Sequence, residues 1–215
     1  MKHLPSWKPP SSLWVFFASA IGGFLLITPL WMQVSNWTSY PTATLTRVVL
    51  ENTAGYWVRS VHATSGSIEV ETRIDVALPD NVKRERGTAE LVAEADPAHY
   101  AYGLPLFVAL LLASRSPHLF KRALAGYLIL LIPQTFSLTF EILRQITVAG
   151  GRPGVLHIDQ WQMEGIALGY QVGSLLLPTL APVALWLWFD RTFFATVVQD
   201  GWLRRDGISP ESPRP

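Results

Sequence analysis

Hydrophobic and polar positions alternate along this chain in long blocks. Four blocks are almost free of charged residues, and they approach the length needed to cross a hydrocarbon core of about 30 Å at about 1.5 Å per residue. We therefore predict an α-helical integral membrane protein with four transmembrane helices, at residues 13–30, 98–114, 123–143 and 165–189. The other residues would form two tails, 1–12 and 190–215, and three connections, 31–97, 115–122 and 144–164.

The longest connection, residues 31–97, has the pattern of a small β domain. Between Ile68 and Leu78 aliphatic or β-branched residues alternate with mostly charged ones, which is typical of a strand with one buried and one exposed face. Residues 88–95 alternate similarly, and residues 44–50 and 56–64 are rich in β-branched and aromatic side chains. We predict a small antiparallel β-rich extracytoplasmic domain between the first and second transmembrane helices.

The first apolar block has two interpretations. Lys2 and Lys8 before an apolar run fit a cleaved signal peptide as well as a retained anchor. Residues 28–32 include a proline and bulky side chains where small residues would precede a cleavage site. We therefore favour a retained signal-anchor helix.

Composition supports the membrane class and excludes several chemistries. Hydrophobic residues make up 49% of the chain and charged residues 15%, against about 25% charged in soluble domains. The net charge is +1 and the basic residues are dispersed, so no nucleic-acid surface is expected. The chain has no cysteine, which excludes disulfides, thiolate metal sites and cysteine nucleophiles.

Basic residues predict the orientation in the membrane. The two tails and the connection 115–122 hold nine Lys and Arg residues, whereas the connection 144–164 holds two. The basic residues of the long connection 31–97 say little about the orientation, because a segment of that length is translocated largely regardless of its charge. We predict that both termini face the cytoplasm and that the β-rich domain lies on the other side.

Ionisable residues gather at the predicted outer ends of the third and fourth spans. Such residues at a membrane edge are costly unless paired or solvated, so they mark a candidate functional cluster. Glu141 and Arg144 are three positions apart on one helix and can form an ion pair. The cluster is interpreted either as an interfacial ion pair beside a solvated loop or as the working part of an enzyme or small transporter. Its members are Glu141, Arg144, His157, Asp159 and Glu164, with Gln160 beside them.

Metal binding and nucleophilic catalysis find little support in the sequence. His157, Asp159 and Glu164 are possible ligand types, but their spacing matches no familiar zinc or iron motif. No Gly-x-Ser-x-Gly or Ser-x-x-Lys arrangement is present. We predict no catalytic residue, no metal and no cofactor.

Aromatic residues and glycines suggest packing or recognition. Trp31 and Trp37 lie at the beginning of the long connection, and Tyr100 and Tyr102 lie just after it, at the expected membrane surface of the second span. They would form either a recognition surface or the domain core with an interfacial belt. Gly165, Gly169 and Gly173 recur every four residues, which favours close packing of the fourth span against another helix.

Three stretches carry a resemblance to a known family. They read Pro-Leu-Trp-Met-Gln-Val-Ser at residues 29–35, Tyr-Ala-Tyr-Gly-Leu-Pro-Leu-Phe at 100–107, and Ala-Leu-Gly-Tyr-Gln-Val-Gly-Ser-Leu-Leu-Leu-Pro-Thr-Leu-Ala-Pro at 167–182. Over residues 13 to 190 the chain resembles the exosortase H-associated membrane proteins of Gram-negative bacteria, which accompany an intramembrane cysteine transpeptidase-like sorting enzyme. The resemblance supplies no catalytic residues. It implies an accessory protein in the inner membrane.

The leading hypothesis is a non-enzymatic accessory protein that binds an exosortase, or the proteins it sorts, within and beside the lipid bilayer. The β-rich domain would contact the partner outside the membrane. Rival hypotheses are an intramembrane enzyme or transporter using Glu141, Arg144, Asp159 and Glu164, and a stand-alone assembly factor. We expect a binding surface where residues 31–40, 97–106 and 141–164 meet.

Overall fold

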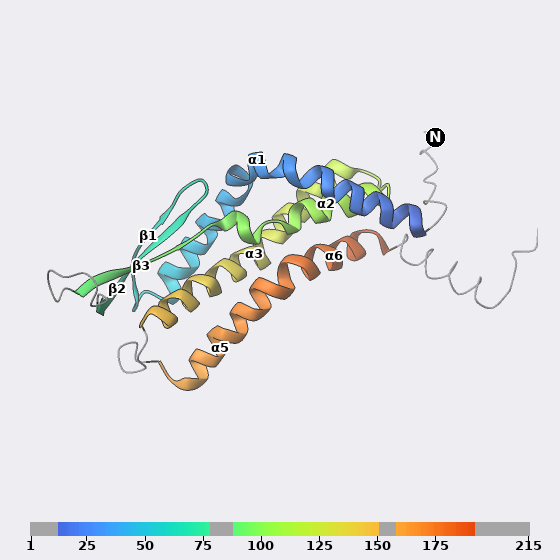
Figure 1. Cartoon of the computed structure of the whole chain (residues 1–215). Coiled ribbons are helices and arrows are strands. Elements are labelled where there is room, and N and C mark those ends of the chain that lie inside the picture. Colours follow the sequence, from blue (N-terminus) through green and yellow to red (C-terminus); the bar gives the residue numbers. More distant parts are fainter. Residues whose placement is uncertain (1–12, 78–87, 151–157, 192–215) are drawn as a thin grey trace, which may run out of the picture.

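The computed structural model describes residues 13–77, 88–150 and 158–191 (Figure 1). His157 and most of both tails therefore lie outside the described residues. The helices are α1 (Leu13–Thr53), α2 (Gly103–Ala113), α3 (Leu119–Gly150), α5 (Gln160–Gln171) and α6 (Leu177–Phe189). Short helical turns are η1 (Pro97–Tyr100) and the π-helical η2 (Val172–Leu176), and the strands are β1 (Val58–Ala63), β2 (Ile68–Ala77) and β3 (Thr88–Ala95).

Three helical stretches are long and apolar enough to cross a membrane. They are Trp14–Thr53, Leu119–Gly150 and Gln160–Phe189, the last built from α5, η2 and α6. The predicted second span is shorter, because α2 has 11 residues and extends about 17 Å at about 1.5 Å per residue. The chain is thus mostly helical, with three long apolar helices and one small antiparallel sheet.

The strand predicted at residues 44–50 is wrong, because these residues belong to α1. Thr42, Thr46, Leu50 and Ala54 are all buried and follow one another at intervals of four residues, which is the spacing of one helix face. The exposed Thr44 bonds its hydroxyl to the carbonyl of Tyr40 one turn earlier, at 3.1 Å. Burial of one helical face therefore overrides the β propensity of this threonine-rich stretch.

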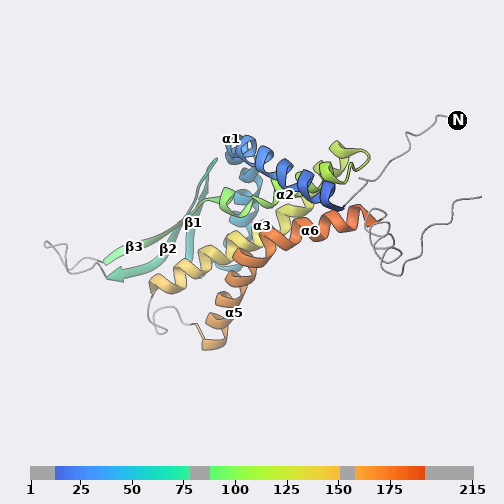
Figure 2. The same ribbon diagram turned by 45° about the vertical axis from the view of Figure 1, so that its right-hand side comes forward.

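Both α1 and α3 extend beyond the spans predicted for them. α1 continues past residue 30 to Thr53, and α3 continues past residue 143 to Gly150. Figures 1 and 2 show that α1 bends in its middle, where Pro29 and Pro41 cannot donate backbone hydrogen bonds. These extensions carry the sheet.

The sheet has the order β1-β2-β3, with both pairs antiparallel. Its strands match the predicted runs 56–64, 68–78 and 88–95, and the alternation places Val61, Val70 and Ala93 in one buried row. This face packs on the second half of α1 and on the second half of α3. The contributing side chains are Leu50 of α1, Ala54 directly after it, and Leu138, Ile142 and Ile146 of α3.

A second apolar core lies at the end of the bundle away from the sheet (Figures 1 and 2). There Phe16 near the start of α1 stacks on Trp186 near the end of α6, with ring centroids 5.3 Å apart. Ala113, which ends α2, belongs to the same cluster. The chain therefore runs toward the sheet in α1 and α3 and away from it in α2 and α5–α6.

Two of the three spaced glycines make the predicted close helix contact. A methyl group at Gly169 would lie 2.2 Å from the ring of Phe140, and one at Gly173 would lie 2.9 Å from the Cα of Ser137. A methyl group at Gly165 would meet nothing within 4 Å. Of the three glycines, Gly169 and Gly173 therefore allow the close approach of α5 and η2 to α3.

Candidate functional site

The candidate site is a polar junction where the sheet meets the helices. Its residues come from four elements that are distant in sequence and meet around Glu141 and Arg144. We call these residues the junction: Glu141, Arg144 and Gln145 of α3, Tyr100 of η1, Tyr170 of α5 and the main chain of Glu94 in β3.

Glu141 and Arg144 form the predicted ion pair. Arg144 Nη2 lies 2.8 Å from Glu141 Oε1, and Arg144 Nε lies 3.1 Å from Glu141 Oε2. The side chains of Glu141 and Arg144 are 10% and 34% exposed, so the carboxylate is largely shielded from water. Two parallel bonds from one guanidinium fix the orientation of both groups.

Gln145 links this ion pair to the sheet. Its Nε2 donates to Glu141 Oε1 at 2.8 Å and to the carbonyl oxygen of Glu94 at 2.9 Å. Its Oε1 accepts from the Glu94 amide at 3.2 Å. Gln145 was missed in the sequence, although its place one helical turn after Glu141 could have drawn attention to it.

Two tyrosines complete the junction. The guanidinium carbon of Arg144 lies 4.5 Å from the ring centre of Tyr170, which is a cation–π contact to α5. The buried side chain of Tyr100 lies beside Glu141. Its turn η1 is held by Asp96, whose side chain accepts from the Ala98 amide at 2.8 Å. Four elements are thereby joined around one carboxylate.

Asp159 and Glu164 make their own contacts on α5. Asp159 caps the start of this helix, and the side chain of Gln162 accepts from its backbone amide at 3.0 Å. Glu164 accepts from the side-chain amide of Gln160 at 3.0 Å. Both carboxylates are exposed. Within the described residues, no hydrogen bond or ion pair joins either of them to Glu141 or Arg144.

The predicted aromatic residues fall into different environments. Trp31 is half-buried and donates from Nε1 to Thr38 Oγ1 at 3.1 Å, whereas the side chain of Trp37 is 78% exposed. Tyr102 is half-buried just after η1. Of these, Trp37 presents the most surface for contact with lipid or another protein.

A family model described as exosortase H-associated membrane protein matches residues 10–193 of the 215-residue chain. The chain belongs to this family. The resemblance carried by residues 29–35, 100–107 and 167–182 is thus confirmed. No curated protein and no solved structure gives a significant match.

The name of the exosortase H-associated family indicates association with exosortase H and agrees with an accessory role. In this member of the family, the polar groups of the junction bond mainly to one another. The Glu141 carboxylate accepts bonds from Arg144 and Gln145, so both of its oxygens already have donors. Its geometry suits a fixed connection between sheet and bundle.

The described residues form no cluster of metal ligands. In residues 13–77, 88–150 and 158–191 of this exosortase H-associated protein, no three His, Asp or Glu side chains are grouped to hold an ion. The predicted candidate His157 lies outside these ranges.

Proposed function

We propose that this protein is a non-catalytic accessory protein of an exosortase-type sorting system in the bacterial inner membrane. The observation that carries the proposal is the junction, together with the family assignment. The Gln145 bonds to Glu94 and the apolar contacts of Leu138 and Ile142 fix the sheet directly on a long apolar helix. A sheet held in this way would present a partner with a surface at constant height above the bilayer.

The proposed topology has four spans, with the sheet in the periplasm and both termini in the cytoplasm. Pro97–Ala113 would be the second span, because α1 and α3 run in the same direction and the chain must return between them (Figure 1). The strongly exposed Trp14 and Trp37 would mark the two interfaces on α1, since about 1.5 Å per residue separates them by about 35 Å.

The helices would bind the exosortase within the bilayer, and the sheet would contact that enzyme or its substrates. Many apolar side chains of the first half of α1 face outward and are available to lipid or a partner helix, including Leu25, Leu26, Leu30, Met32 and Val34. Trp37 lies just beyond them, at the level proposed for the outer interface. Its exposed ring supports a contact at the base of the sheet.

Copurification with an exosortase in mild detergent tests this function. We expect the wild-type protein to retain the enzyme, and we expect sorting of its substrates to fail when this protein is deleted. Trp37→Ala should weaken copurification more than Phe120→Ala, which removes another exposed ring at the opposite end of the bundle. Normal sorting in the deletion strain would contradict the proposed role.

A further inference from the structure

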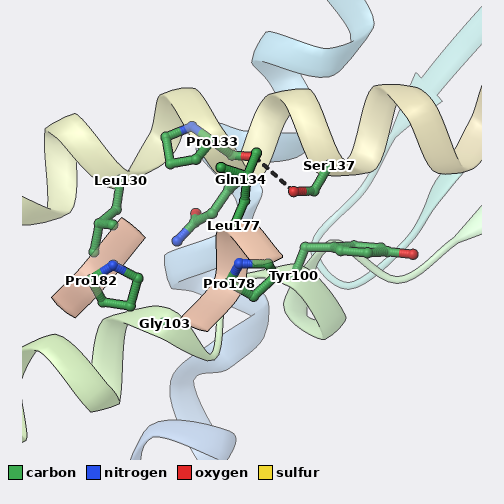
Figure 3. Close-up of a pocket in the computed structure, with 9 residues that line it drawn as sticks. All are labelled: Tyr100, Gly103, Leu130, Pro133, Gln134, Ser137, Leu177, Pro178 and Pro182. Carbon is green, nitrogen blue, oxygen red and sulfur yellow. Dashed lines mark hydrogen bonds between the residues drawn. The ribbon is translucent and has the colours of Figure 1, made fainter. Parts of the chain in front are cut away.

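A small cavity lies inside the bundle between α3 and the proline-rich start of α6 (Figure 3). Its volume is about 10 Å³, which is close to the space that one water molecule needs. Tyr100 and Gly103 close it from the side of η1 and α2. The remaining lining residues are Leu130, Pro133, Gln134, Ser137, Leu177, Pro178 and Pro182.

The side-chain amide of Gln134 provides a polar group at this cavity. Gln134 is 5% exposed, and its Oε1 accepts from Thr42 Oγ1 at 2.9 Å. In Figure 3 its nitrogen points toward the prolines of α6, and within the described residues this nitrogen has no hydrogen-bond partner. Because the Thr42 hydroxyl can donate or accept, exchanging the oxygen and nitrogen of Gln134 would still leave one polar atom facing the cavity.

The backbone of α6 provides an acceptor. Pro182 has no N–H, so it cannot donate the usual helical bond to the carbonyl of Pro178 four residues earlier. Gly103 brings α2 close to this carbonyl, since a methyl group there would lie 2.8 Å from the Pro178 oxygen. Pro178, which lines the cavity, therefore has a carbonyl without its normal helical donor.

A second carbonyl nearby, that of Gly173, also lies at an irregular point of the helix, and a side chain of α3 donates a hydrogen bond to it. In the π turn before Pro178, the Leu177 amide bonds to the carbonyl of Val172 five residues earlier. The carbonyl of Gly173 in the same turn accepts from the Ser137 hydroxyl at 2.7 Å. Ser137 thus compensates for one irregularity of the helix. The Pro178 carbonyl requires a different donor.

We propose that this cavity binds one water molecule, which bridges the Gln134 side-chain amide and the Pro178 carbonyl. The water donates to the carbonyl and accepts from the amide nitrogen. The bridge would give the Gln134 amide nitrogen a partner and would replace the helical donor that Pro182 cannot supply to the Pro178 carbonyl. The water would connect α3 with the proline-rich start of α6, beside Tyr100 of the junction.

A map of the full-length protein in lipid nanodiscs, resolved well enough to show ordered water, tests the site directly. We expect a peak within about 3.2 Å of both the Gln134 amide and the Pro178 carbonyl oxygen. A map that shows ordered water elsewhere in the bundle but none at this position would overturn the proposal.

Thermal unfolding of variants gives a second test. Gln134→Met removes the bond to Thr42 and the water contact, whereas Thr42→Val removes only the former. We expect Gln134→Met to lower Tm by several degrees more than Thr42→Val. Pro182→Ala restores a backbone donor for the Pro178 carbonyl, so this difference should shrink by at least half in that background. An unchanged difference contradicts the bridge; if Gln134→Met does not fold, the map of the wild-type protein decides.

Discussion

The side chain of Gln145 pairs with the main chain of Glu94 as a neighbouring strand would. It accepts from the Glu94 amide at 3.2 Å and donates to the Glu94 carbonyl at 2.9 Å. Since β3 is an edge strand, these are groups that would otherwise be open to another strand. Gln145 therefore blocks strand addition at this point of β3, and β1 is the other edge at which a partner strand could be added.

Gln145→Ala should loosen the sheet. The substitution removes three hydrogen bonds at a partly exposed position, so we expect a loss of about 1–2 kcal/mol in the free energy of unfolding. Thermal unfolding in detergent and hydrogen exchange at the Glu94 amide measure the effect. Gln171→Ala, at an exposed position of α5, is the control and should stay within about 0.5 kcal/mol. Equal behaviour of the two variants would contradict this role of Gln145.

Arg144→Met should destabilise the protein more than Glu141→Gln. The first leaves a shielded carboxylate without its cation, whereas the second leaves a neutral amide that can still accept a bond from Gln145. For Arg144→Met we expect a loss of about 1–3 kcal/mol in the free energy of unfolding. The loss is limited because Arg144 is partly exposed, so water can solvate the carboxylate that remains. Thermal unfolding in nanodiscs compares the two variants.

Substitution of Glu141 by alanine distinguishes a structural role of this residue from a catalytic one. If the junction is a fixed connection, loss of sorting in Glu141→Ala should follow loss of the protein from the membrane. Quantitative immunoblotting beside the sorting assay gives both values. Abolished sorting with an unchanged amount of protein would instead support an enzyme or transporter that uses Glu141.

The sequence predicted best those features that depend on local periodicity. Alternation identified β2 and β3, and the spacing of Glu141 and Arg144 identified their ion pair. It failed at residues 44–50, where threonines have β propensity but pack along one helix face. Contacts such as Gln145 with Glu94 join segments far apart in the chain, and no local pattern encodes them.

Alanine substitutions should distinguish Gly169 and Gly173, which pack against α3, from Gly165, which shares only their spacing. Gly173→Ala should destabilise most, because the new methyl group would lie 2.9 Å from backbone at Ser137. Gly169→Ala should also destabilise, since the Phe140 ring must move. Gly165→Ala is the matched control and should be neutral or stabilise by up to about 1 kcal/mol, because alanine favours helix over glycine and the site is open. Thermal unfolding ranks the three, and a Gly165→Ala loss equal to the others would contradict the packing.

The proposed topology can be measured with single cysteines, because the chain has none of its own. Ser65 lies exposed in the turn between β1 and β2, and Lys121 lies exposed near the start of α3. With the sheet in the periplasm, Ser65→Cys should react with a membrane-impermeant maleimide in intact spheroplasts. Lys121→Cys should react only after the membrane is permeabilised, because α2 and its preceding turn return the chain to the cytoplasmic side. Labelling of both sites in intact spheroplasts would mean that Pro97–Ala113 does not cross, and the protein would then have three spans.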